Sequence, residues 1–126
     1  MRLFLLAAGG GAIGAGARYL VNVTCAACLG AAFPWATLIV NVVGSFLMGI
    51  VVATSLPLLG GSAAWRTFLA TGILGGFTTF SAFSLDAWEL FERQHTALAV
   101  SYIASSVVLS ILGLVAGLAV TRTVLS

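Results

Sequence analysis

The amino-acid sequence predicts an all-α membrane protein with four transmembrane helices in a single transmembrane domain, residues 1–126. The chain is 61% hydrophobic and only 6% charged, with a mean hydropathy of +1.19, which is too apolar for a soluble domain of this size. Its charges also lie far apart, so that residues 19–65 and 94–121 contain no arginine, lysine or acid. Such stretches supply the roughly 20 apolar residues with which a helix crosses a bilayer.

Four apolar segments along the chain are each long enough to span a bilayer. Prolines separate the first three, and a short polar turn precedes the last. The segments are Leu3–Thr24, Trp35–Leu56, Ser62–Glu92 and Thr96–Thr123, with linkers at Cys25–Pro34, Pro57–Gly61 and Arg93–His95. The first segment follows Arg2 as in a signal peptide, but the apolar pattern resumes after it with little interruption, so we expect a retained helix.

Small residues recur four positions apart in three of the predicted helices. The pairs are Gly10 with Gly14, Ala12 with Gly16, Ser45 with Gly49, and Gly113 with Gly117. In a bilayer such pairs let two backbones approach closely, and helices associate there by packing. The pattern leaves open whether these contacts form within one chain or between two. Because four helices are few to enclose a pore, we expect a dimer.

The arginines indicate little preference for one orientation in the membrane. If the N-terminus lies on one side, the arginines near that side are Arg2, Arg66 and Arg122, and those near the other are Arg18 and Arg93. This is a weak bias under the positive-inside rule. A chain with weak bias inserts either way up, so that two opposite copies would form an antiparallel dimer.

The third predicted helix contains the most informative segment, residues 72–84, which reads Gly-Ile-Leu-Gly-Gly-Phe-Thr-Thr-Phe-Ser-Ala-Phe-Ser. Two adjacent glycines predict that this helix is broken near Gly75–Thr79. Backbone groups freed by a break at membrane depth need partners or must line a cavity. The carbonyl end of the first half would suit a cation and the amide end of the second an anion, and a kink relieved by water is the alternative.

Side chains near the break fall into two rows. Phenylalanines and hydroxyl side chains each recur every third residue, which on one helix gives an aromatic strip beside a hydroxyl strip: Phe77, Phe80 and Phe83, and Thr78, Ser81 and Ser84. The edge of an aromatic ring is electropositive and attracts an anion. Ordinary core packing of these rings is the alternative.

The second and fourth helices each carry a polar line with the spacing i, i+4, i+8: Thr37, Asn41 and Ser45, and Tyr102, Ser106 and Ser110. Neither line contains an acid or a base. Uncharged donors suit a small, strongly hydrated anion, because they replace its water without trapping it, whereas cation paths and proton-coupled transporters use carboxylates, carbonyl rings or histidine. The alternatives are ordinary hydrogen bonds between helices or to the preceding turn.

The remaining polar residues exclude several classes of protein. A net charge of +2 is too small for nucleic-acid binding, and three acids in the whole chain predict neither a metal cluster nor the paired carboxylates of an enzyme. Cys25 and Cys28 have no further thiol or nearby histidine and are interpreted as small apolar residues. Arg18 is expected inside the membrane or at its edge, and Asp86 at a mouth or among the headgroups.

Three motifs in successive helices resemble the signatures of one membrane-protein family: Gly10–Tyr19, Thr37–Gly49 and Gly72–Ser84. Their order, in a chain of this length, resembles the Fluc-type fluoride channels. The resemblance implies a single channel domain, without enzymatic activity, in the cytoplasmic membrane of a microbe, through which trapped fluoride leaves the cell passively. It also implies an antiparallel, dual-topology homodimer with two fluoride pores.

The resemblance further implies roles for individual residues. Phe80 and Phe83 would line the fluoride path, and Asn41 would donate to the ion. The other expected path residues are Thr37, Ser81, Ser84, Tyr102, Ser106 and Ser110. Backbone oxygens of Gly75 and Thr78 from both subunits would hold a central structural sodium ion, and Arg18 and Asp86 would lie at an interface or vestibule. The chain departs from the family pattern at Ala82, where threonine is usual, and at Asp86, where glutamate is commoner.

Two other functions are compatible with a small four-helix membrane protein. A multidrug exporter can also be a dual-topology dimer, but it would need a membrane-buried carboxylate for proton coupling, and the first predicted helix has none. A non-transporting assembly subunit would show no ion flux. Flux measured with purified protein in liposomes separates both alternatives from a channel.

Overall fold

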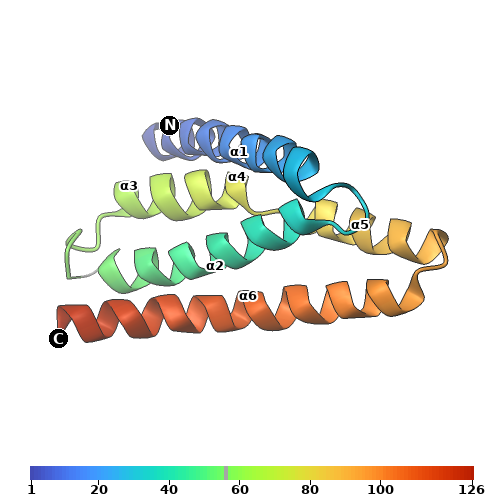
Figure 1. The fold of residues 1–126 in the computed structure, drawn as a ribbon. Coiled ribbons are helices and arrows are strands. Elements are labelled where there is room, and N and C mark those ends of the chain that lie inside the picture. Colours follow the sequence, from blue (N-terminus) through green and yellow to red (C-terminus); the bar gives the residue numbers. More distant parts are fainter. Residues whose placement is uncertain (56) are drawn as a thin grey trace.

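The computed structural model describes residues 1–55 and 57–126, which form helices joined by short connections (Figure 1). Four helical stretches are long and apolar enough to cross a bilayer, which confirms the predicted all-α, four-span fold. Three of them are the helices α1 (Arg2–Leu29), α2 (Trp35–Ser55) and α6 (Thr96–Leu125). The third span, Ala63–Glu92, is divided into α3 (Ala63–Arg66), η1 (Thr67–Leu74), α4 (Gly75–Phe77) and α5 (Phe80–Glu92).

The observed helix ends differ from the expected ones by a few residues, with the largest difference in α1. This helix continues through Cys25, predicted as the start of a linker, to Leu29. No glycine or proline lies between Cys25 and Gly30, and Gly30, whose φ of 75° is in the left-handed region that glycine favours, ends the helix. The expected end of the second helix, Leu56, lies outside the described residues.

The spans form two packed pairs. Helix α2 lies along α6, and α1 lies on η1 and α4 (Figure 1). Helix α5 contacts the part of α6 that follows the connection between them. Both chain termini lie at the same end of the molecule, with the short connection between α5 and α6 at the other (Figure 1). The end that carries the termini therefore also carries Arg2 and Arg122, as the sequence predicted.

Most of the small-residue pairs pack inside the chain. A Cβ atom on Gly14 would lie 2.8 Å from the backbone nitrogen of Phe77, and one on Gly49 would lie 2.8 Å from that of Leu118. These distances are too short for any side chain, so the glycines permit the contacts of α1 with α4 and of α2 with α6. Gly16, in contrast, has no atom near its missing Cβ, so its pair is not used within the chain.

The third span is broken within the predicted range, but not at the glycines. Gly75 and Gly76 are helical in α4, and the chain becomes extended at Thr78 (φ −80°, ψ 160°) and Thr79 (φ −154°, ψ 120°). Gly76 serves packing instead, since a Cβ there would lie 3.0 Å from the Cα of Gly11. The break also separates Phe77 from the helix that carries the later phenylalanines, so the single three-residue aromatic strip predicted from the sequence is wrong.

Candidate functional site

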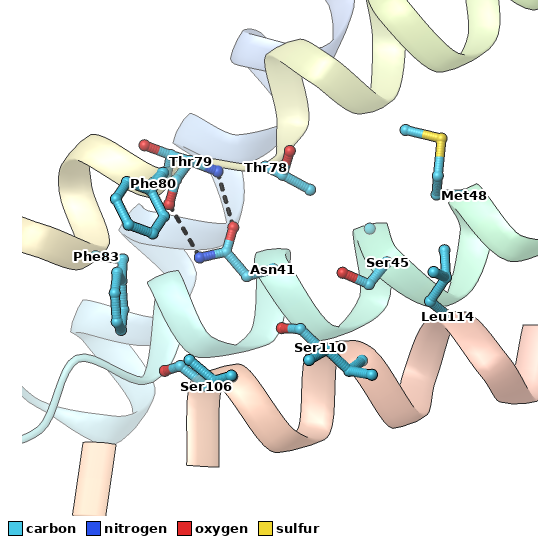
Figure 2. A pocket seen from close by; sticks show the side chains of 13 residues that line it. Asn41, Ser45, Met48, Thr78, Thr79, Phe80, Phe83, Ser106, Ser110 and Leu114 are labelled. Atoms are coloured by element: carbon cyan, nitrogen blue, oxygen red, sulfur yellow. Dashed lines mark hydrogen bonds between the residues drawn. The ribbon is translucent and has the colours of Figure 1, made fainter. Parts of the chain in front are cut away.

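A pocket of about 380 Å³ lies where α2, α6 and the break of the third span meet, and we call it the central pocket (Figure 2). Its wall combines hydroxyl and amide groups with two phenylalanine rings and aliphatic side chains. The lining residues are Asn41, Gly44, Ser45, Met48, Thr78, Thr79, Phe80, Phe83, Ser106, Val107, Ser110, Ile111 and Leu114. The pocket thus brings together parts of both polar lines and the phenylalanine pair, and no acid or base lines it.

Asn41 fastens the break of the third span to α2. Its Nδ2 donates to the carbonyl oxygen of Thr79 at 3.0 Å, and the Thr79 N–H donates to its Oδ1 at 2.8 Å (Figure 2). The hydrogen bond between helices, which the sequence left as an alternative for this residue, is therefore present. An amide nitrogen has two N–H groups, so the second one remains available to another acceptor.

Thr79 caps the second half of the broken span. Its Oγ1 accepts from the N–H of Ala82 at 3.2 Å, the usual bond of a threonine at the N-terminus of a helix. The same hydroxyl lies 3.3 Å from the Ser81 hydroxyl. The N-terminus of α5, with its positive dipole end, is thereby held at the edge of the central pocket. The sequence predicted that the second half of the span starts near Thr79, but not the cap formed by its hydroxyl, although a threonine directly before a renewed apolar pattern is a helix-start signal.

The two phenylalanines of α5 pack on each other at the pocket with tilted rings. The Phe80 and Phe83 ring centroids are 5.4 Å apart, with 47° between the ring planes. Phe83 also packs on Tyr102, with centroids 5.4 Å apart. Phe80 remains 78% exposed on the single chain, which is unusual for a residue that lines a pocket.

The break leaves the carbonyls of Gly75 and Thr78 without their helical donors. In a continuous helix the N–H of Thr79 would bond to the Gly75 oxygen, and that of Ala82 to the Thr78 oxygen. Here the first N–H donates to Asn41 and the second to the Thr79 hydroxyl. Carbonyl oxygens are suitable ligands for a hard cation. The expected sodium-binding oxygens therefore fit such an ion, and no cluster of three acidic, cysteine or histidine side chains lies elsewhere in the described residues.

Tyr102 lies beside the central pocket and is completely buried. Its hydroxyl donates to Asp86 Oδ2 at 3.1 Å, and the side chains of Thr37 and Ser106 lie next to it. The Ser106 Oγ is buried without a hydrogen-bond partner in the part of the chain that the structure describes. A polar atom of this kind is suited to an incoming ligand, since leaving it unpaired is costly.

Asp86, the hydrogen-bond partner of Tyr102, lines a second pocket of about 350 Å³. We call it the end pocket, because Arg93, at the α5–α6 connection, also lines it. Asp86 and Thr37 both line it, with Asn22, Glu89 and Arg93. Tyr102 therefore contacts one wall residue of each pocket, Phe83 and Asp86. The sequence did not predict the pairing with Asp86, but the hairpin geometry was a signal: both residues lie eight positions from Gln94, in the turn.

The sequence is similar to known proteins along nearly the whole chain. The model of the family described as CrcB-like protein, Camphor Resistance (CrcB), matches residues 5–118. The chain belongs to the CrcB family.

Several relatives carry the name fluoride-specific ion channel FluC, and three of them are compared with this chain. Cereibacter sphaeroides has one that is 56% identical over 113 residues, 90% of this chain and 89% of the relative. The relative from Agrobacterium fabrum is 54% identical over 117 residues, 93% and 94% of the two chains. That from Rhodospirillum centenum is 49% identical over 123 residues, 98% of each.

Membership of the CrcB family confirms the resemblance found in the three sequence motifs. Together with the four spans, it makes the chain a multi-pass protein of the cell membrane. The family match extends over all the residues that line the central pocket.

Five expected residues of this CrcB-family chain lie outside both pockets: Gly75 and Tyr102, described above, and Arg18, Ser81 and Ser84. Ser81 is exposed beside Thr79, and Ser84 is exposed and donates to the Phe80 carbonyl at 2.9 Å. Arg18 is half-buried on α1 and lines neither pocket. It has no carboxylate within ion-pair distance among the residues described; the ion pair found there joins Arg93 and Glu89 at 3.5 Å.

Proposed function

We propose that this protein is a fluoride-selective channel and not an enzyme. The observation that carries the proposal is the central pocket, whose uncharged donors lie in a chain 49% to 56% identical to relatives named fluoride-specific ion channels. The free N–H of Asn41, the unpartnered Ser106 hydroxyl and Ser110 supply donors that replace water around the ion. Because no acid or base lines this pocket, the ion is neither repelled nor trapped, and transport needs no proton exchange.

The fluoride path would continue from the central pocket past Tyr102 to the end pocket. Thr37 of the end pocket and Ser106 of the central pocket both lie next to the Tyr102 hydroxyl, so that hydroxyl groups continue from one pocket to the other. Such a row allows an ion to exchange one donor for the next without complete loss of its ligands. Arg18 and Asp86 would act near the entrances, where charge attracts or repels the ion before it enters.

The working unit would be an antiparallel, dual-topology homodimer with two pores. Phe80 is largely exposed, and Gly75 also lies on the outer surface of the single chain, so a second copy would cover both. Each copy contributes one central pocket, and two copies give two paths. Fluoride that enters a cell as the neutral acid and dissociates inside would leave passively through either path, down its electrochemical gradient.

A structural sodium ion would lie between the two copies, held by the Gly75 and Thr78 carbonyls of each. The support is that these oxygens have lost their helical donors and that Gly75 faces outward. If the ion is structural, exhaustive removal of sodium lowers fluoride flux without any sodium current. An unchanged flux in sodium-free buffer would contradict this part of the proposal.

The proposed function is tested with purified protein in liposomes loaded with equal concentrations of potassium fluoride and potassium chloride. We expect rapid fluoride efflux after potassium permeability is supplied, and no chloride efflux. Exchange of a hydrophobic cation for protons would indicate an exporter, and absence of all flux an assembly subunit. Liposomes without protein measure the leak of each ion.

A further inference from the structure

The hydrogen bonds at the break suggest why two particular carbonyls are open to a cation. A broken helix does not by itself keep its carbonyls free, because a short rotation of the backbone can re-form the helix and return each N–H to its carbonyl. Neither Thr78 nor Thr79 is a proline or glycine, and both can adopt helical angles. A specific interaction must therefore hold the extended conformation at these two residues.

Two side chains hold it, and each accepts one of the diverted N–H groups. Asn41 Oδ1 accepts from Thr79 at 2.8 Å, so this N–H is not available to Gly75. Thr79 Oγ1 accepts from Ala82 at 3.2 Å, so that N–H is not available to Thr78. The Asn41 Nδ2 group also donates to the Thr79 carbonyl at 3.0 Å, which fixes the orientation of the same peptide unit. Thr79 is buried, and water does not readily replace these bonds.

We propose that Asn41 and Thr79 are positioning residues for the cation site: each diverts one N–H and thereby keeps one carbonyl, Gly75 or Thr78, free to bind the ion. This inference rests on the proposed sodium site and adds a second role to Asn41, which also lines the central pocket. Asn41 thus contributes both to the wall of the central pocket and to the conformation of the break.

Two substitutions test the proposed roles of Asn41 and Thr79 one at a time. Asn41→Leu keeps four side-chain heavy atoms and the branch at Cγ but cannot accept, so the Thr79 N–H returns to the Gly75 carbonyl. Thr79→Val removes only the hydroxyl, so the Ala82 N–H returns to the Thr78 carbonyl. Each variant loses one ligand oxygen per chain, and we expect the sodium concentration for half-maximal thermal stabilisation to rise by about tenfold or more. The full-length protein is measured in detergent, with sodium replaced by N-methylglucamine at constant ionic strength.

Two further variants serve as controls. Thr79→Ser retains the accepting hydroxyl and should keep the wild-type sodium dependence. Thr54→Val makes the same chemical change on α2, where the hydroxyl only bonds to its own preceding turn. If Asn41→Leu and Thr79→Val lower the melting temperature but leave the sodium midpoint unchanged, the two residues are merely structural and the inference is wrong. If the wild type shows no stabilisation by sodium, the proposed sodium site itself fails, which is a different result.

A second measurement tests the diverted N–H without sodium. Thr78 and Thr79 form the only Thr-Thr pair in the sequence, so 1-¹³C,¹⁵N-threonine labelling gives one NMR signal for the Thr79 amide bonded to a labelled carbonyl. In Asn41→Leu we expect this amide to stay protected from hydrogen exchange, with a shifted resonance, because it transfers to the Gly75 carbonyl. Rapid exchange would show that the amide has no new partner and that Gly75 remains free, which overturns the inference.

Discussion

Phe80 is a large apolar side chain that is exposed to solvent on the single chain. Its ring lines the central pocket and yet is 78% exposed on one chain. A core phenylalanine would be buried, so the packing alternative weighed for this residue does not describe it. Phe83, in contrast, packs on Tyr102 and has both a structural and a pocket-lining role.

The first prediction concerns this exposed ring. Phe80→Ile should abolish fluoride flux in liposomes and leave a folded protein, because isoleucine fills space but offers no electropositive ring edge to the ion. Flux is measured with a fluoride electrode, and folding by size-exclusion chromatography. Phe4→Ile is a matched control, since Phe4 is also exposed, on α1 and far from the pocket. Wild-type flux in Phe80→Ile would remove this residue from the path.

The second prediction concerns the hydroxyl between the two pockets. Tyr102→Phe removes the bond to Asp86 and the donor between the pockets but keeps the ring contact with Phe83. We expect fluoride flux to fall by roughly fivefold, since one lost hydrogen bond corresponds to about 1 kcal/mol. Asp86→Asn, which retains an acceptor for the tyrosine, should lose less. Equal flux in Tyr102→Phe and wild type would mean that the hydroxyl is only structural.

Among the helices, the third span shows that glycine pairs serve different purposes. Gly75-Gly76 was predicted to break the helix because glycine is a poor helix former. The pair is helical, because Gly76 is needed for the close approach of α4 to Gly11 on α1, and tertiary packing outweighs a propensity difference of about 1 kcal/mol per residue. The break falls instead where Asn41 and a threonine cap provide alternative hydrogen bonds.

A third prediction follows from this contact. Gly76→Ala places a Cβ 3.0 Å from the Gly11 Cα, so α1 and α4 must separate. We expect a loss of about 1 to 3 kcal/mol in stability, typical of overpacking, measured as a lower urea or thermal midpoint in detergent. Gly9→Ala is the control, because no atom lies near its missing Cβ. If both variants unfold at the same midpoint, the close contact of α1 with α4 does not limit stability.

For the protein as a whole, the distribution of arginines bears on the proposed antiparallel dimer. Arg2 and Arg122 lie at the end with the termini, and Arg93 lies at the other, beside Glu89. Neither end carries the strong excess of positive charge that imposes one orientation. A chain of this kind is expected to insert both ways up, which is what an antiparallel pair of identical chains requires.

The fourth prediction tests this orientation with a native thiol. Cys28 is exposed in the last turn of α1, at the opposite end of this helix from the N-terminus. In a Cys25→Ala background, a membrane-impermeant maleimide added to intact cells should label about half of the molecules, and permeabilisation should allow labelling of the rest. A Cys25→Ala, Cys28→Ala variant gives the background. Complete labelling, or none, in intact cells would exclude dual topology.

The sequence by itself determined the fold class, the four spans and the family. These follow from local properties: the length of apolar runs sets the number of spans, and turn residues separate them. It also predicted most of the polar residues of the pocket lining, because donors at i, i+4, i+8 share a helix face and both polar lines contribute to the central pocket.

Only the tertiary structure decided which polar atoms meet. Asn41 bonds to Thr79 at the break from 38 residues away, and Tyr102 bonds to Asp86 across a hairpin. Ser81 and Ser84 share the spacing of their row with Thr78 but lie outside the pocket, since the extended residues at the break rotate α5 away from that row. Residue spacing predicts a shared face only within one continuous helix, and the helix is interrupted at the segment where the ions would bind.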